Sequence, residues 1–326
     1  MTKKKLYIIT GVAGMVGSTL LPKILSKKNS IVVGIDNLKL GKIKFIKKLL
    51  NKKNFFFFKL NLHKNIKNNK LKYLLNNNKL EEIWHLAANS DIQAGTKNSN
   101  VDYNDTFLTT FNSLNFVKPY LNQNSKIIFA SSSAIYGSIG HNINEKSAPF
   151  LPESNYGAMK LASEGFLSSY SFSNKIRSFI FRFPNVIGKN LTHGVIFDLS
   201  RKILLNTKIL NVLGNGEQCK PYSSVDEIIN CMMHIIKLKN KNLVNFYNIG
   251  TNDKGVKVKD IVKLLVKKFN YSEKVIYEKK NIGWKGDIPA YSYSTKKINK
   301  LGYKFRLSSI MALKKTIKAI SKKTLF

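Results

Sequence analysis

Two side chains in the middle of the chain are spaced so that they can share one proton-transfer site. Tyr156 and Lys160 occupy positions i and i+4 of the run Tyr-Gly-Ala-Met-Lys, which places them on one face of a helix. An ammonium near a phenol favours the phenolate, so we expect the pKa of Tyr156 to fall from its usual value of about 10. The pair therefore predicts an acid–base centre that works near neutral pH.

Three hydroxyl side chains follow an apolar run upstream of this pair. Ser131, Ser132 and Ser133 come directly after residues 126–130, which have the pattern of a buried strand. Open α/β sheets bind their ligands at the carboxyl ends of the strands. We therefore expect a serine here to hold a hydroxyl or carbonyl group of a substrate.

A glycine-rich turn near the start of the chain has the spacing of a dinucleotide site. Gly11, Gly14 and Gly17 are separated by two residues each, follow the apolar run 6–9 and open an apolar helix. Glycine lets the backbone approach a pyrophosphate bound at the helix N-terminus. Asp36 ends the next apolar run, where a carboxylate binds both hydroxyls of the adenine ribose and repels a 2′-phosphate. The pattern favours NAD over NADP.

The expected contacts of NAD come from the ends of several strands and from the acid–base pair. Small side chains after the fourth apolar run allow the backbone to approach the cofactor closely. The full set is Gly11, Gly14, Met15, Val16, Gly17, Asp36, Asn37, Leu86, Ala87, Ala88, Tyr156 and Lys160.

Short apolar runs alternate with helix-like segments in the first part of the chain. The runs lie at residues 6–9, 31–35, 55–60, 83–86, 126–130 and 178–181. Strands that are apolar throughout and alternate with helices predict an α/β fold, in which a doubly wound parallel sheet is covered on both faces. We expect a Rossmann-type NAD-binding domain at 1–182 and a smaller C-terminal substrate-binding lobe at 183–326, partly interleaved with the first.

The charge of the chain is unusual for an enzyme. Its 326 residues include 55 Lys and Arg against 18 Asp and Glu, for a formal net charge of +37. Only four of the basic residues are arginine, the side chain that best reads phosphates and bases, and the lysines are scattered. We interpret the charge as a bias of composition and do not expect nucleic-acid binding; a functional polyanion surface is the alternative interpretation.

Two further features bear on the compartment. Cys219 and Cys231 lack the spacing of a metal site or a disulfide framework. The first strand follows the N-terminus at once, without the apolar segment of a signal peptide, and no apolar run is long enough to span a bilayer. We expect a cytoplasmic protein that has no membrane partner and binds no metal.

Together these motifs resemble the extended short-chain dehydrogenase/reductases of the NAD-dependent epimerase/dehydratase family, with similarity to UDP-glucose 4-epimerases over nearly the whole length. The resemblance implies that Ser132, four residues before the tyrosine of Tyr136-Gly137, is catalytic, that Tyr156 is the general base and that Lys160 binds the cofactor ribose. It also implies the reaction: Tyr156 removes the 4-hydroxyl proton of a sugar as hydride passes to NAD, and the 4-keto intermediate rotates before hydride returns.

The same resemblance assigns residues to a nucleotide-sugar substrate. It places Ser132, Ser133, Asn185, His193, Lys220 and Asp287 in that site. His193 is equally well explained as a structural histidine. Lys220 stands where the family commonly has arginine, and Trp284, near Asp287, stands where another arginine is expected. The nucleotide contacts therefore depart from the family pattern.

Other functions remain open at this stage. A reductase of 4-keto nucleotide sugars would use the same three residues and consume reduced cofactor. A dehydratase of the family typically has Thr-Asp-Glu where this chain has Ser132-Ser133-Ala134, which argues against dehydration. A non-catalytic RNA-binding or cofactor-sensing protein is a more distant alternative. Pairing into a homodimer through helices near 105–117 and 156–170 is expected from the resemblance.

Overall fold

A single parallel sheet forms the larger part of the protein. The computed structural model describes residues 3–325 except 285 and 293. Seven strands lie in the order β11-β6-β5-β4-β1-β2-β3, and neighbouring strands are all parallel. Their bounds are β1 Lys5–Thr10, β2 Ser30–Asp36, β3 Phe55–Lys59, β4 Lys79–His85, β5 Lys126–Ser132, β6 Arg177–Phe183 and β11 Val244–Asn248. The predicted α/β fold with a doubly wound parallel sheet is confirmed.

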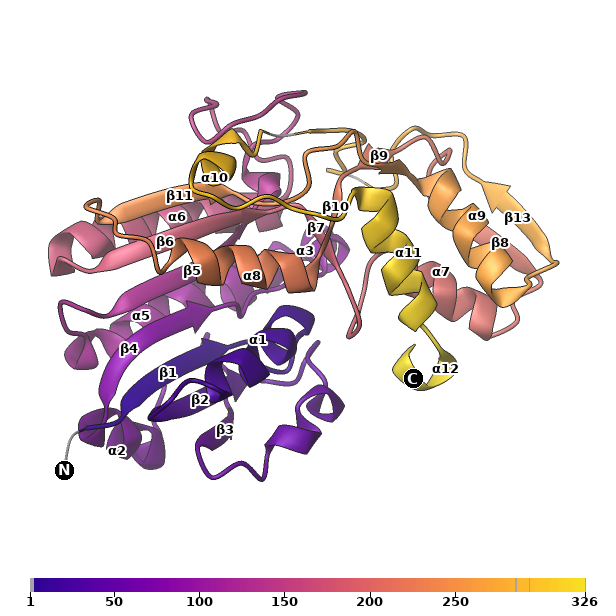
Figure 1. Ribbon diagram of the computed structural model, residues 1–326. Helices are drawn as coiled ribbons and strands as arrows, with labels where there is room; N and C mark the ends of the chain where they lie inside the picture. The colour runs from indigo at the N-terminus through magenta and orange to yellow at the C-terminus, as the bar shows by residue number, and fades with distance from the viewer. Residues whose placement is uncertain (1–2, 285, 293, 326) are drawn as a thin grey trace.

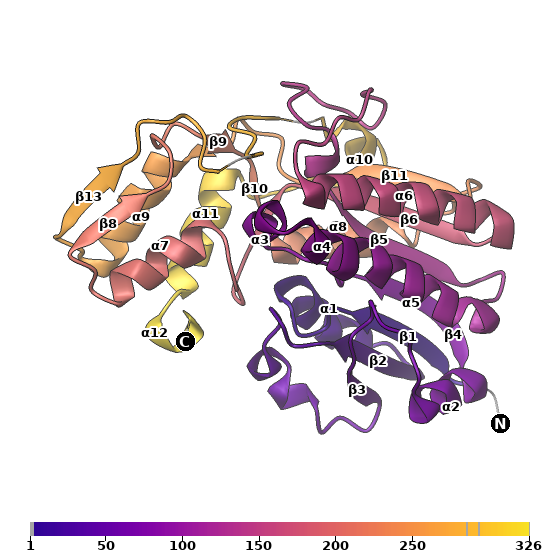
Figure 2. The same cartoon turned by 180° about the vertical axis from the view of Figure 1, so that it is seen from behind.

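Helices cover both faces of this sheet (Figures 1 and 2). One face carries α1 Met15–Leu25, α8 Val225–Ile235 and α10 Lys296–Lys300, and the other carries α2 Asn69–Asn77, α5 Thr109–Val117 and α6 Asn155–Asn174. Because both faces are covered, strand residues are buried on both sides, as their apolar sequences require. Each of the six apolar runs forms a strand, while β11, with its mixed sequence Val-Asn-Phe-Tyr-Asn, was not predicted.

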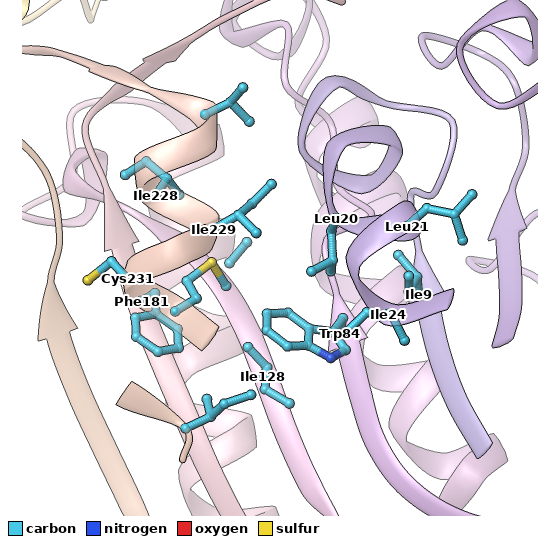
Figure 3. Close-up of a cluster of buried hydrophobic side chains, with 14 of the residues drawn as sticks. Ile9, Leu20, Leu21, Ile24, Trp84, Ile128, Phe181, Ile228, Ile229 and Cys231 are labelled. Carbon is cyan, nitrogen blue, oxygen red and sulfur yellow. The ribbon is translucent and has the colours of Figure 1, made fainter. Parts of the chain in front are cut away.

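Helices α1 and α8 pack on the sheet through a core of buried apolar side chains (Figure 3). Leu20 from α1 and Ile228 from α8 pack from neighbouring helices onto the strands, and Trp84 of β4 is fully buried between them. The indole nitrogen of Trp84 donates to Glu82 at 2.8 Å, so this large ring leaves no polar atom unpaired in the core. Cys231 is part of the same apolar cluster, and burial raises the pKa of its thiol.

A smaller lobe stands beside the carboxyl ends of the strands (Figure 1). It contains the two-stranded pairs β8 Ile209–Val212 with β13 Lys274–Tyr277 and β9 Cys219–Lys220 with β12 Val256–Lys257, and the helices α7 Val195–Leu204, α9 Val258–Phe269, α11 Ser309–Ala319 and α12 Lys322–Leu325. Residues such as Leu199, Ile261 and Leu313 form its own core. A third pair, β7 Asn185–Ile187 with β10 Tyr222–Ser224, connects the two parts.

The chain after β6 divides between the two parts. It leaves the sheet for the small lobe, returns to form α8 and β11, and returns again for α10. Both lobes therefore contribute to the space above the carboxyl ends of the strands. None of the helices in the described part of the chain combines the length and apolar character that a membrane span requires.

Candidate active site

One large cavity, of about 910 Å³, opens above the carboxyl ends of the strands and between the lobes. Its wall includes every residue that the sequence predicted for catalysis, for the cofactor and for the substrate. These residues come from α1, β2, β5, α6, β7 and β9 and from loops, among them those that follow β1 and β4. The topology thus brings together side chains that are far apart in the sequence.

The glycine turn between β1 and α1 is packed so tightly that side chains are excluded. Gly11 has a φ of +69°, and a Cβ on it would lie 2.9 Å from the backbone nitrogen of Ala87. A Cβ on Gly17 would lie 2.2 Å from the carbonyl oxygen of Gly11. Gly14 precedes the first turn of α1 and has no side chain with which to cap it, so the amides there stay available to an anion.

Asp36 lines the cavity beside the glycine turn. It is 7% exposed, and its two carboxylate oxygens accept hydrogen bonds from the backbone nitrogens of Ala13 at 2.9 Å and Leu38 at 2.8 Å. Burial raises its pKa, and the two amides act in the opposite direction. Each oxygen keeps a lone pair for a hydroxyl group, and the carboxylate disfavours a phosphate. The glycine cradle and this carboxylate together fit a dinucleotide with a free ribose diol.

Three side chains meet where β5 ends beside the first turns of α6. Ser132 is the last residue of β5, and its Oγ accepts from the backbone nitrogen of Ala134 at 3.1 Å. Tyr156, in the first turn of α6, lies close enough to Ser132 for the serine hydroxyl to act on its pKa. Lys160 lies below them, with its Nζ 5.8 Å from the centre of the Tyr156 ring and 2.5 Å from the carbonyl oxygen of Ala130.

The pKa of Tyr156 is shifted in the direction opposite to the one that the sequence predicted. We predicted that Lys160 would lower it, whereas burial raises the pKa of Tyr156 to about 12, and the nearby Ser132 hydroxyl, which acts in the opposite direction, offsets this only in part. Burial also lowers the pKa of Lys160 to about 7, although Glu164 acts in the opposite direction. Removal from water disfavours both charged forms and outweighs their mutual stabilisation. At neutral pH, therefore, Tyr156 keeps its proton.

A buried ion pair that the sequence analysis missed lies directly beneath this centre. Glu164 and Arg182 are both about 3% exposed in their side chains and form two hydrogen bonds, at 2.7 and 3.0 Å. Ser131 also donates to Glu164, at 2.5 Å, and Arg182 donates to the Tyr136 hydroxyl at 2.8 Å. Glu164 follows Lys160 by four residues, so the spacing of Tyr156, Lys160 and Glu164 along one helical face was the available signal.

A second missed group is the buried carboxyl of Asp102. It is fully buried, and its Oδ1 accepts from Asn89 of the cavity wall at 2.7 Å. A Cβ at Gly95 would lie 1.7 Å from its Oδ2, so only glycine leaves room for this carboxyl. Burial raises the pKa of Asp102, and its charge contributes to the raised pKa of Tyr156.

The substrate end of the cavity contains the remaining predicted residues. Ser133 donates to the hydroxyl of Tyr291 at 3.2 Å, and Asn185 donates to the same hydroxyl at 3.4 Å. Tyr291 is a further residue that the sequence did not indicate. Lys220 forms an ion pair with Asp287, and its Nζ lies 5.0 Å from the centre of the Trp284 ring. Lys220 and Trp284, which replace the expected arginines, are thus in contact.

His193 occupies the wall near α7. Its Nδ1 lies 2.9 Å from the Oγ1 of Thr192. Burial lowers the pKa of His193, and the charge of Asp91 acts in the opposite direction. The imidazole therefore favours its neutral form, which can donate or accept a hydrogen bond in the cavity.

Comparison with known proteins agrees with this geometry. A family model described as GDP-mannose 4,6 dehydratase matches residues 8–310. A putative UDP-glucose 4-epimerase of Methanocaldococcus jannaschii is 25% identical over 96% of this chain and 97% of its own length. A dTDP-D-glucose 4,6-dehydratase of Dictyostelium discoideum is 29% identical over 75% of this chain and 58% of its own length.

Solved structures share the whole architecture. A UDP-galactose 4-epimerase has a TM-score of 0.81 and 25% identity, covering 98% of this chain and 99% of its own. A UDP-glucuronic acid 4-epimerase from Bacillus cereus, in complex with UDP-glucuronic acid and NAD, has a TM-score of 0.83 and 23% identity over 99% of this chain and 100% of its own.

The buried ion pair yields a prediction about stability. Glu164→Gln removes one charge and leaves Arg182 buried without a counter-ion, which typically costs about 3–5 kcal/mol. We expect a loss of that size in the free energy of unfolding, measured by urea denaturation. Glu217→Gln, which removes an exposed carboxylate between Lys257 and Lys259, serves as the control and should change little. Equal stabilities of the two variants would contradict the account.

Proposed function

This chain belongs to the NAD-dependent epimerase/dehydratase family, and from that premise we propose that it is a 4-epimerase of a nucleoside diphosphate hexose. The observation that carries the proposal is the placement of Ser132, Tyr156 and Lys160 at one point of the cavity that also contains the glycine cradle and Asp36. The residues after Ser132 are Ser133 and Ala134, which offer no carboxyl group for the elimination of water. This supports epimerisation over dehydration.

The cofactor is NAD, which solved relatives of this fold contain. Gly11, Gly14 and Gly17 would receive the pyrophosphate, Asp36 the adenine ribose and Lys160 the second ribose. Asn37 and the backbone of 86–88 would complete the binding wall. NAD, when bound, accepts a hydride from the substrate and returns it, so an epimerase consumes no external reductant.

Side chains of the protein would carry out the proton transfer. The Ser132 hydroxyl would hold the 4-oxygen of the sugar against the phenol oxygen of Tyr156, which lies near enough for Ser132 to act on its pKa. Tyr156 would take the 4-hydroxyl proton as the sugar is oxidised and give it back as the sugar is reduced. Lys160 is the cation that favours the phenolate during this transfer, and Glu164 beneath it supports its charge.

The substrate end would orient the nucleotide sugar. Asn185 and Ser133, joined through Tyr291, form a polar wall beside Ser132. The ammonium of Lys220 would contact the diphosphate in exchange for part of its pairing with Asp287, and His193 would contact the sugar or a phosphate. With lysine in place of arginine, the diphosphate is held by a point charge instead of a bidentate fork.

The activity can be tested directly with nucleotide sugars. Purified protein, without added reductant, is incubated with UDP-glucose, UDP-N-acetylglucosamine and their galacto isomers, and the sugar protons are followed by NMR. We expect interconversion of one gluco and galacto pair. Tyr156→Phe removes the acid–base group and should slow the reaction about 100-fold or more.

Tyr73→Phe, which changes an exposed tyrosine on α2, serves as the matched control and should leave the rate unchanged. Failure to convert any of the four sugars would contradict the simple UDP-hexose assignment. Reduction of an added 4-keto nucleotide sugar, with oxidation of one NADH for each sugar reduced, would instead identify the second candidate, a reductase that would use the same three residues.

We further propose that the protein pairs into a homodimer through α5 and α6. Phe111 of α5 and Phe166 of α6 are in contact, with ring centres 5.0 Å apart, and Phe111 is 37% exposed. Phe172, near the end of α6, is 63% exposed. Next to Phe166, α6 exposes small residues, such as Gly165, that would let another helix approach closely. Two such faces would form a four-helix contact.

A charge placed on this face should separate the subunits. Phe111→Glu would bury a carboxylate in the proposed contact, so we expect a monomer by light scattering where the unchanged protein gives a dimer. Met311→Glu, which places the same charge at an exposed site on α11, is the control and should leave the dimer intact. An unchanged protein that is monomeric at every concentration tested would contradict the proposal.

A further inference from the structure

Two charged side chains are joined at the end of the cavity where the adenosine of NAD would lie. Lys39 belongs to the loop after β2, three residues beyond Asp36, and Asp105 belongs to the helical turn Tyr103–Leu108 that precedes α5. Both line the cavity, together with Leu60 and Leu62 from the loop after β3. The Nζ of Lys39 lies 2.6 Å from Oδ2 of Asp105, so two walls of the cavity are connected here.

Asp105 is held from a third wall as well. Its other oxygen, Oδ1, lies 3.1 Å from Nδ1 of His63, in the loop after β3. Asn112 of α5 donates to the backbone oxygen of His63 at 2.8 Å and keeps this loop against the helix. The carboxylate of Asp105 is therefore only 13% exposed, whereas the side chain of Lys39 is 57% exposed. Asp105 is the fixed partner, and Lys39 is the one that is free to swing away.

The loop that carries Lys39 is itself closed over the glycine turn. The backbone nitrogen of Lys42 donates to the carbonyl oxygen of Ala13 at 3.0 Å, and that of Leu38 donates to Asp36. A Cβ at Gly41 would lie 2.8 Å from the carboxylate of Asp36. The loop therefore begins and ends against the residues that would bind the ribose and pyrophosphate, and Lys39 extends from its middle to the opposite wall.

We propose that Lys39, Asp105 and His63 form an ionic latch across the adenosine end of the NAD site. The latch must open for NAD to enter or leave, and it closes again in both the free and the bound state. It therefore slows binding and release to a similar degree and contributes little to the equilibrium affinity. This inference rests on the proposed NAD site, and it suits an enzyme that keeps one NAD through many turnovers better than a reductase that must exchange it.

The exchange of NAD tests the latch. Protein loaded with radiolabelled NAD is diluted into unlabelled NAD, retention of label gives the release rate, and the quenching of tryptophan fluorescence gives the binding rate. Because exposed ion pairs contribute up to about 1 kcal/mol, Lys39→Gln and Asp105→Asn should each raise both rates about threefold to fivefold, with an unchanged Kd. Lys44→Gln, which removes an exposed lysine from the same loop, is the control and should change neither rate.

Salt supplies a second measurement that does not depend on any variant. Screening weakens an exposed ion pair, so added salt should speed NAD release from the unchanged protein and have a smaller effect on Lys39→Gln. A release rate that rises together with a proportional loss of affinity would show direct contact with NAD and overturn the latch, as would unchanged rates. Protein that binds no NAD at all would overturn the cofactor assignment and the latch together.

Discussion

The geometry of the active site depends on the buried ion pair between Glu164 and Arg182. Two charges withdrawn from water are tolerated only when each has its partners, and here Ser131 and Tyr136 complete the set. The pair joins α6 to β6, and Ser131 joins the same carboxylate to β5. Because the helix cannot slide without breaking these bonds, Tyr156 and Lys160 are held at one register relative to the end of β5.

The same burial that fixes this register also decides the resting protonation of the site. Tyr156 is shifted toward its neutral phenol and Lys160 toward its neutral amine. A helix with tyrosine and lysine on one face is therefore not sufficient for a reactive phenolate. The proposed chemistry needs the charge of Lys160, and the negative charge of Glu164 beneath it is the feature of the fold that favours that charge.

Local patterns in the sequence were sufficient for six of the seven strands of the sheet and for the glycine turn. Apolar runs marked these strands, and the glycine spacing marked a turn whose close packing excludes side chains at Gly11 and Gly17, because these features depend on neighbours in sequence. The contacts and the pKa shift that the sequence did not reveal depend on groups that are far apart in the sequence. Arg182 meets Glu164 and Tyr291 meets Ser133 only after folding, and the pKa of Tyr156 depends on desolvation, which no spacing reveals.

We propose above all that the hydride removed from C4 of the sugar returns to the same sugar within each turnover, without exchange with a pool of reduced cofactor. UDP-glucose and UDP-N-acetylglucosamine, each deuterated at C4, can be incubated with the protein and an excess of unlabelled NADH, and the galacto product analysed by mass spectrometry. The account predicts a product that retains its deuterium, because the hydride never leaves the site. A product that carries hydrogen from the NADH pool in place of deuterium would contradict it.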